Sequence, residues 1–298
     1  MGLSHLKLSL WEGNQIVYEF DFRMKRFVLT ILAVSFTLGG WALAQSGPVS
    51  AGVLPAGDDF PASPPVQTDD RTPAVLLAPP QLPRMTPDLT LQTYRNRVVQ
   101  QSARLSSYSA NSLILAQLPE TQQFGECDLQ RFYSAPHTLE FKSVRFVGDG
   151  FVKSNVIIRL LQSEVDHVQK DDPTVTALSD DNYKFSYKGT TQLQNRLVHI
   201  FQLKPRTNHL GLFKGKIYLD AHTGNMVRAE GRVSKSPSLF IKRIEFVQDY
   251  KEVGAFNFPV HIHSEARTRL VGRAVVDVYH YDYQPVPSTQ TAQLTAGQ

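Results

Sequence analysis

Residues 257–283 read NFPVHIHSEARTRLVGRAVVDVYHYDY, and the order of apolar and polar residues in this stretch decides the fold. One set of alternating positions holds Val260, Ile262, Ser264 and Ala266, then Leu270, Ala274, Val276 and Val278. The opposite set holds His261, His263 and Glu265, then Arg267, Arg269 and Arg273. A period of two is typical of a β-strand with one face toward a core and one toward water. The stretch therefore predicts two amphipathic strands.

Similar segments recur along most of the chain, each rich in Val, Ile, Leu, Phe and Tyr and bounded by turn residues. They are 107–118, 127–135, 139–147, 183–187, 194–203, 215–221, 226–233, 238–248, 257–266 and 270–283. Because most of these segments follow one another without a helix between them, they favour an antiparallel meander over a parallel sheet. Two connections, Gly148-Asp149-Gly150 and Thr223-Gly224-Asn225, have the residues that reversed hairpin turns require.

Two amphipathic helices are predicted beside the strands. Thr86-Pro87-Asp88 is typical of a helix start, and an apolar stripe of Leu91, Tyr94, Val98 and Leu105 follows it. Ser154 is the expected cap of a second helix over 155–170, whose stripe includes Val156, Leu160, Leu161, Glu164, Val165 and Val168. The predicted fold class is mainly β with α: a curved antiparallel half-barrel sheet, covered on its concave face by amphipathic helices.

The first 87 residues divide into three segments. Lys25-Arg26, the apolar run 27–44 and its Ala42-Leu43-Ala44 ending predict that 24–44 is a signal peptide cut after Ala44, for export to the periplasm. An uncleaved anchor is the alternative. Residues 1–23 then look like a gene-model extension. Ten of the 18 prolines fall in 45–87, which predicts a disordered spacer. We expect one domain over 88–285 and a flexible tail over 286–298.

Composition excludes several classes of protein. The 298 residues are 42% hydrophobic, enough for a packed core, and one cysteine, Cys127, provides neither an intrachain disulfide nor a structural zinc site. Because Gln45 and not cysteine follows the apolar run, no lipid anchor is expected. The formal net charge of +4 does not demand a polyanionic partner, and nucleic acid is a poor partner for an exported protein.

Catalytic signatures are absent from the sequence: no G-x-S-x-G, H-E-x-x-H or G-x-G-x-x-G motif occurs. His261, His263 and Glu265 share one strand face and include residue types that bind zinc or iron. A solvated strand face explains the same periodicity, so a metal-dependent enzyme using these residues is the less favoured hypothesis. We expect no enzymatic activity, no cofactor and no metal.

Three motifs carry a resemblance to a known family. They are Asn182-Tyr183-Lys184-Phe185; the segment Leu212–Asp220 with Thr223-Gly224 and Val227-Arg228-Ala229-Glu230-Gly231; and Phe258-Pro259 followed by Arg267–Tyr283. With the signal peptide and the leading helix, they resemble the periplasmic outer-membrane lipoprotein-sorting carriers, the LolA/LolB-like superfamily, and its uncharacterised relatives. The resemblance implies a half-barrel whose concave side, lined by helices, binds acyl chains of lipoproteins or other lipids.

The favoured function is therefore non-enzymatic binding of lipid or lipoprotein acyl chains in an apolar cavity. Six strand residues are candidates for its lining: Leu113, Leu115, Phe185, Phe201, Leu219 and Ile262. The alternative is an envelope adaptor or sensor that binds a protein partner. Peripheral membrane contact through Arg267, Arg269 and Arg273 also stays open, and we expect a monomer.

Overall fold

A computed structural model describes residues 83–170, 172–237 and 239–288 of the chain. Its main feature is one sheet of ten antiparallel strands. The strands are β1 (Leu105–Leu118), β2 (Gln123–Ser134), β3 (Thr138–Gly148), β4 (Tyr183–Leu193), β5 (Arg196–Pro205), β6 (Phe213–Asp220), β7 (Met226–Val233), β8 (Ile241–Val253), β9 (Phe256–Thr268) and β10 (Arg273–Pro287). The expected signal peptide, the extension before it and most of the spacer and tail lie outside the described residues.

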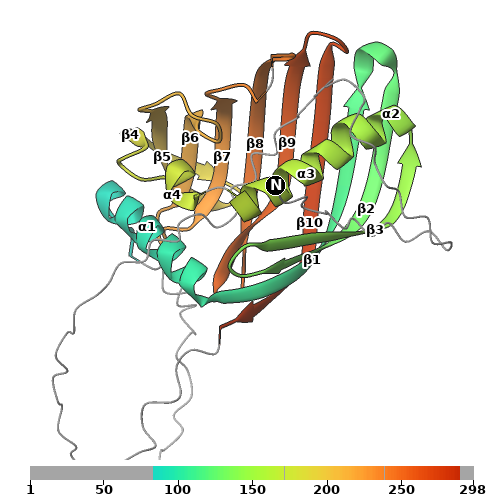
Figure 1. Ribbon diagram of the computed structural model, residues 1–298. Coiled ribbons are helices and arrows are strands. Elements are labelled where there is room, and N and C mark those ends of the chain that lie inside the picture. The colour runs from blue at the N-terminus through green and yellow to red at the C-terminus, as the bar shows by residue number, and fades with distance from the viewer. Residues whose placement is uncertain (1–82, 171, 238, 289–298) are drawn as a thin grey trace, which may run out of the picture.

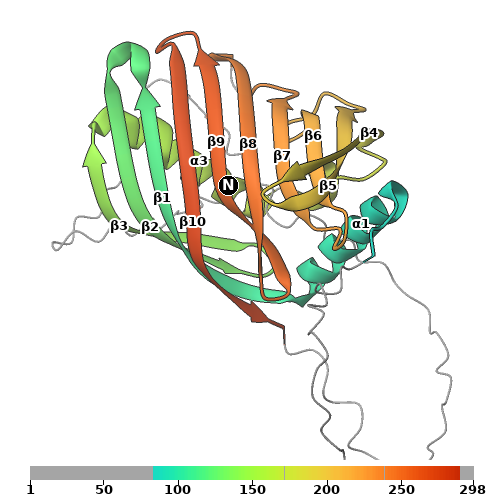
Figure 2. The same cartoon turned by 180° about the vertical axis from the view of Figure 1, so that it is seen from behind.

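The strand order is β3-β2-β1-β10-β9-β8-β7-β6-β5-β4, so the first and last strands pair in the interior of the sheet. Every other pairing joins strands that are consecutive in the chain. The sheet does not close on itself, and it curls around a hollow side that faces the viewer in Figure 1; Figure 2 shows the outer side. The predicted fold class, a curved antiparallel half-barrel that is mainly β, is confirmed.

The first helix, α1 (Pro87–Arg104), begins as the sequence predicts. The Thr86 hydroxyl accepts a hydrogen bond from Leu89 N at 3.4 Å, and Pro87 occupies the first helical position. The helix ends at Arg104, earlier than expected, because Leu105 already belongs to β1. The amide of Met85 donates to the carbonyl of Ala221 at 2.9 Å, which attaches the helix start to the β6–β7 turn.

The second helical run starts one turn before the predicted cap at Ser154. Gly148-Asp149-Gly150 forms no hairpin turn: β3 ends at Gly148, where φ is +120°, and α2 (Gly150–Val152) follows. A π-helical turn, η2 (Lys153–Ile157), continues into α3 (Ile158–Lys170). The predicted hairpin is therefore wrong here, whereas the turn at Thr223–Asn225 joins β6 to β7 as predicted.

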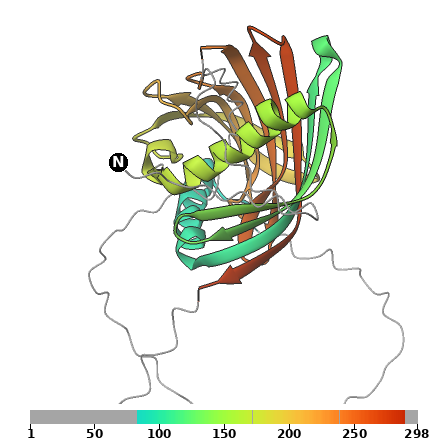
Figure 3. The same cartoon turned by 45° about the vertical axis from the view of Figure 1, so that its right-hand side comes forward.

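The run from α2 to α3 crosses the concave face of the sheet diagonally, as Figures 1 and 3 show. It starts beside the β3 edge and leads through the short helix α4 (Pro173–Thr176) to β4 at the opposite edge. A single helical connection thus both covers the sheet and links its two edges. None of the helices among the described residues has the length and hydropathy needed to cross a bilayer.

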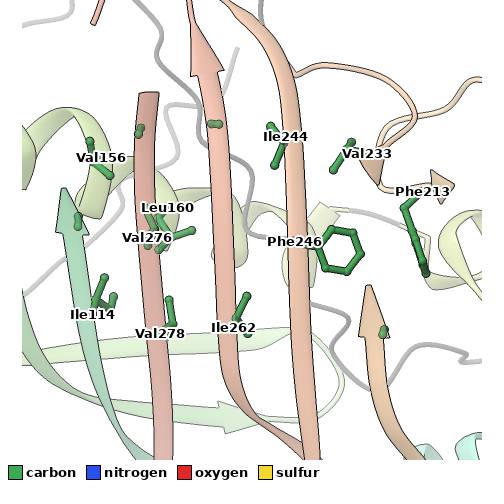
Figure 4. Close-up of a cluster of buried hydrophobic side chains, with 14 of the residues drawn as sticks. Ile114, Val156, Leu160, Phe213, Val233, Ile244, Phe246, Ile262, Val276 and Val278 are labelled. Carbon is green, nitrogen blue, oxygen red and sulfur yellow. The ribbon is translucent and has the colours of Figure 1, made fainter. Parts of the chain in front are cut away.

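The core lies between this helical run and the concave face. Side chains from β1, β8, β9 and β10 lie opposite Val156 and Leu160 in Figure 4, among them Ile114, Ile244, Ile262, Val276 and Val278. All of these side chains are buried. The alternation in 260–278 is confirmed for Ile262, Ala266 and Ala274, but Leu270 is 59% exposed because it lies in the β9–β10 turn.

Candidate functional site

A pocket opens on the concave side between α1, the segment 174–181 and strands of the sheet's second half. Its volume is about 330 Å³, at the lower end of the range for small-molecule sites. Figure 3 shows the ends of α1 and α3 converging on this region. Residues of α1 and His167 of α3 both line the pocket.

The pocket is lined mainly by apolar groups. Its walls and floor include Tyr94, Val98 and Val99 of α1, Ala177 and Leu178 of the 174–181 segment, and Phe213, Met226, Ala229 and Tyr250 of the sheet. Tyr94 and Val98 lie one helical turn apart, so both point from α1 to the same side. The same amphipathic stripe that predicted this helix therefore forms one wall of the pocket.

Close packing fixes α1 at this position. Gly224, with φ +73°, lies beneath Thr93; a Cβ at Gly224 would approach the Thr93 Cγ2 to 2.9 Å. At the other end of the helix, the amide of Asn257 donates to the side-chain carbonyl of Gln101 at 3.3 Å. The helix wall is therefore attached to the turns of the sheet at both ends.

Two tyrosines add neutral surface to the pocket. Burial raises the pKa of Tyr250 well above its usual value of 10, and burial likewise raises the pKa of Tyr94. Both phenols thus remain uncharged at physiological pH, and their rings can contact an apolar ligand.

Polar side chains occupy the rim. Arg95 makes a bidentate ion pair with Asp180, with two N–O distances of 2.8 Å, and its guanidinium lies over the Phe185 ring at 4.7 Å. Arg97 donates to the side-chain oxygen of Asn225 at 3.1 Å. The two arginines of α1 are thus among the polar residues that line the pocket, which also include the buried Gln101, Asn225 and Asn257.

A second group of polar residues is buried under α3. Arg131 of β2 pairs with Glu164 of α3 at 3.0 Å, and the two side chains are 4% and 2% exposed. His280 Nδ1 lies 2.7 Å from the Ser112 hydroxyl, and its Nε2 lies 3.3 Å from Arg131 Nη1. Gln248 is fully buried, and within the described residues its side-chain oxygen and nitrogen have no hydrogen-bond partner. The contact between α3 and the sheet is therefore not purely apolar.

The six predicted lining residues separate into two groups. Phe201, Leu219 and Ile262 are buried in the core on the concave side, and Phe185 packs partly buried against that core. Leu113 and Leu115 lie on the outer face, because they alternate with the buried Ile114 and Ala116. These two leucines therefore do not point into the concave side as expected. None of the six lines the pocket, so contact between any of them and a ligand remains a prediction.

His261, His263 and Glu265 lie on the outer face, as their alternation predicts. His261 Nε2 and His263 Nδ1 lie 3.1 and 2.9 Å from one oxygen, Oδ1 of Asp277. Among the described residues, no group of three or more His, Cys, Asp or Glu side chains has a geometry that could hold a metal ion. Arg267, Arg269 and Arg273 are exposed on the same outer side.

Sequence reasoning missed the pocket and the buried ion pair. Glu164 gave a signal, since it is an acid within the apolar stripe of the second helix, and a buried acid requires a partner. Nothing in the local pattern around Arg131 identifies that partner, which lies on a distant strand.

Cys127 is buried on the concave side, and burial raises the pKa of its thiol, in agreement with an inert cysteine.

Several solved structures have a similar arrangement of elements at low sequence identity. A DUF1329 family protein from Desulfovibrio piger matches 69% of this chain and 94% of its own, with 8% identity and a TM-score of 0.36. A LolA superfamily protein from Nitrosomonas europaea matches 67% of this chain and 93% of its own, with 9% identity and a TM-score of 0.32.

A third similar structure is the MucA/MucB complex of Pseudomonas aeruginosa, which matches 66% of this chain and 99% of the matched chain, with 11% identity and a TM-score of 0.24. No protein-family model matches the sequence, and no curated protein matches it significantly. Matches with such low TM-scores give no information on activity.

Proposed function

We propose that this protein is a non-enzymatic carrier of the periplasm, which binds an acyl chain of a lipid or lipoprotein on the concave side of its half-barrel. The observation that carries this proposal is the pocket of about 330 Å³ between α1, the 174–181 segment and the sheet, with its largely apolar lining. A concave, apolar site with a few polar groups at its edge suits a ligand with a long apolar part.

The energetics support an acyl chain as the ligand. Burial of one methylene contributes about 0.8 kcal/mol, so a chain that inserts several methylenes gains enough to offset the entropic costs of binding. The rings of Tyr94 and Tyr250 are neutral, so these two side chains present no charge to the chain. The pocket does not need to enclose a whole lipid, since the remainder of a bound molecule can extend past the rim.

Export of this carrier is part of the proposal and depends on the signal peptide predicted over 24–44.

Titration of the full chain with a fluorescent fatty-acyl probe tests the proposal. Val99 lines the pocket and is 48% exposed, so Val99→Trp fills space there without disturbing the core. We expect saturable binding to the wild type and at least ten-fold weaker binding to Val99→Trp. The matched control is Val144→Trp, because Val144 is a 65%-exposed valine on the β3 edge, away from the pocket.

Absence of saturable binding to fatty acids, phospholipids and lipopeptides would overturn the carrier. It would favour the alternative, an envelope adaptor that binds a protein. One feature already suits that alternative: β3 is an edge strand, and it exposes Val144 and Val147 beside its free backbone groups. Equal loss of binding in Val99→Trp and Val144→Trp would also count against the pocket as the site.

A further inference from the structure

Arg97 is a cation that lies at the apolar pocket without an acidic partner. Its side chain is partly buried on α1, and its Nη1 donates to the Asn225 oxygen at 3.1 Å. This is its one hydrogen bond within the part of the chain that the structure describes, and none of the ion pairs there includes it. A guanidinium has five N–H donors in a planar fork, so most of the donors of Arg97 remain available.

Other arginines near the pocket are neutralised. Arg95, two residues earlier on α1, is held by both oxygens of Asp180. Arg196 lies 3.8 Å from Asp220 and 3.7 Å from Glu252. Arg97 therefore differs from these neighbours in forming no ion pair within the described residues.

Asn225 holds Arg97 in place without neutralising it. The Asn225 side chain is 4% exposed, its oxygen accepts from Arg97, and its nitrogen donates to Glu252. Both ends of this amide are occupied, and the acid at its other end, Glu252, lies 3.7 Å from Arg196. A guanidinium without an ion pair beside a largely apolar cavity is suited to a planar or tetrahedral oxyanion, which it can bind through two parallel hydrogen bonds.

The acidic residue that lines the pocket, Asp181, forms no ion pair with Arg97 within the described residues. Asp181 belongs to the 174–181 wall and follows Asp180, the partner of Arg95, whereas Arg97 is attached to the β6–β7 turn through Asn225. The rim thus has its positive side where α1 meets the turn. An amphipathic ligand with an anionic end would orient that end toward this side and its chain toward Val98 and Tyr250.

We propose that the ligand of this pocket is an acyl chain that ends in an anionic oxygen group, a carboxylate or a phosphate, and that Arg97 binds this group. The inference rests on the proposed function and specifies its ligand: neutral lipids of the same chain length bind more weakly. It also assigns the direction of the chain, with the head at the junction of α1 and the β6–β7 turn.

Isothermal titration of the full chain with decanoate, decyl phosphate and decanol, each below its micelle-forming concentration, tests the inference. The three probes share one chain length and differ in the head group. We expect the wild type to bind the better of the two anions at least ten-fold more tightly than decanol, because a charge-assisted hydrogen bond is worth about 1.5–3 kcal/mol, a factor of ten or more. Comparison of the two anions distinguishes a carboxylate ligand from a phosphate ligand.

Variants at two positions of one helix complete the test. Arg97→Gln should remove the preference for anions and leave decanol binding within about two-fold. Arg97→Lys should retain much of the preference for anions, since it keeps the charge. If the glutamine variant folds poorly, the lysine variant provides a second measurement of this preference. Arg104→Gln is the matched control, because Arg104 is an exposed arginine on α1 that does not line the pocket.

The outcomes separate the two proposals. Equal binding of all three probes to the wild type would overturn the assignment of Arg97 and leave the acyl-chain site intact. If Arg97→Gln weakens the binding of all three probes equally, the assignment of Arg97 would also be overturned, since the residue would then only support the α1 wall of the pocket. Failure of every probe to bind would instead overturn the acyl-chain site itself.

Discussion

Arg131 on β2 and Glu164 on α3 form an ion pair of 3.0 Å across the interface between sheet and helix, with both side chains almost fully buried. His280, Tyr108 and Phe141 surround the guanidinium. A shift of α3 along the sheet would separate these two charges and leave both of them buried, so the pair favours the observed register of α3.

Breaking this pair should be costly. Arg131→Met leaves the carboxylate of Glu164 buried and alone, so we expect a loss of about 3–5 kcal/mol in the free energy of unfolding, measured in urea. Arg145 on β3 provides the control, because its ion pair with Glu126 is exposed, and Arg145→Met should cost less than about 1 kcal/mol. The double variant Arg131→Met with Glu164→Leu should recover most of the loss. If Arg131→Met and Arg145→Met lower the free energy of unfolding by similar amounts, this would contradict a buried ion pair between α3 and the sheet.

Stability should fall on mild acidification because of His280. Burial and then the charge of Arg131 lower the pKa of His280 well below its usual value of 6.5, so this ring stays neutral in the folded state. The unfolded state binds a proton near pH 6.5, and stability is therefore complete above that pH and declines as the pH falls toward the native pKa, by up to about 1.4 kcal/mol per pH unit.

Urea unfolding between pH 7.5 and 5.5 (about one unit on each side of a histidine's usual value) measures this dependence. His280→Gln should flatten the profile relative to the wild type, whereas His209→Gln, at an exposed histidine, should leave it unchanged. Ser112, Arg131, Glu164 and Tyr283 are the polar groups near His280, and all four stay the same in both variants. Parallel profiles for the wild type and His280→Gln would show that other groups determine the acid sensitivity.

The boundary of the domain can be tested by truncation. The Met85 amide donates to Ala221, its carbonyl lies 3.0 Å from His199 Nε2, and Thr86 caps α1, so we expect residues before the predicted boundary at Asp88 to contribute to stability. A fragment that starts at residue 83 should unfold at the same temperature as a fragment starting at Gln45. A fragment that starts at Asp88 should lose about 1–2 kcal/mol. If the fragment that starts at residue 83 unfolds at a lower temperature than the one that starts at Gln45, residues 45–82 would contribute to the stability of the fold.

Export should be accompanied by cleavage after Ala44. The order of basic residues, apolar run and small-residue ending in 24–44 is that of a secretory signal peptide. N-terminal sequencing of the protein recovered from the cell envelope should therefore begin at Gln45. A protein that retains residues before Met24 would contradict both the cleavage and the interpretation of 1–23 as a gene-model extension.

Local features of the fold were predictable, and contacts between distant segments were not. The cap at Thr86 and the turn at Asn225 depend on neighbouring residues, and both occur as expected. The face of β1 was not predictable, because Leu113, Ile114 and Leu115 are consecutive apolar residues and give no alternation to read. Pairing with distant strands places one set inside: β10 aligns Ile114 with Val278, and β2 aligns Ile114 with Cys127.

The site follows the same division. The apolar stripe of α1 is visible in the sequence. The strand residues that line the pocket beneath it come from 213–257, and strands β1 to β5 separate them from α1 in the chain. The role of Arg97 depends on the absence of an acid nearby, which becomes visible only when its neighbours in space are known. Glu164 was recognisable as an acid on an apolar stripe, whereas its partner Arg131 was not.

Because β10 lies between β1 and β9, the sheet consists of two meanders that its last strand joins. Strands β1 to β3 and strands β4 to β9 each pair only among themselves until residues 273–287 have emerged from the ribosome or the export channel. One edge of β1 therefore stays open through most of synthesis, which exposes it to misassembly and slows folding. A chain that stops before β10 would keep both groups of strands and lose the β1–β10 and β10–β9 ladders that join them.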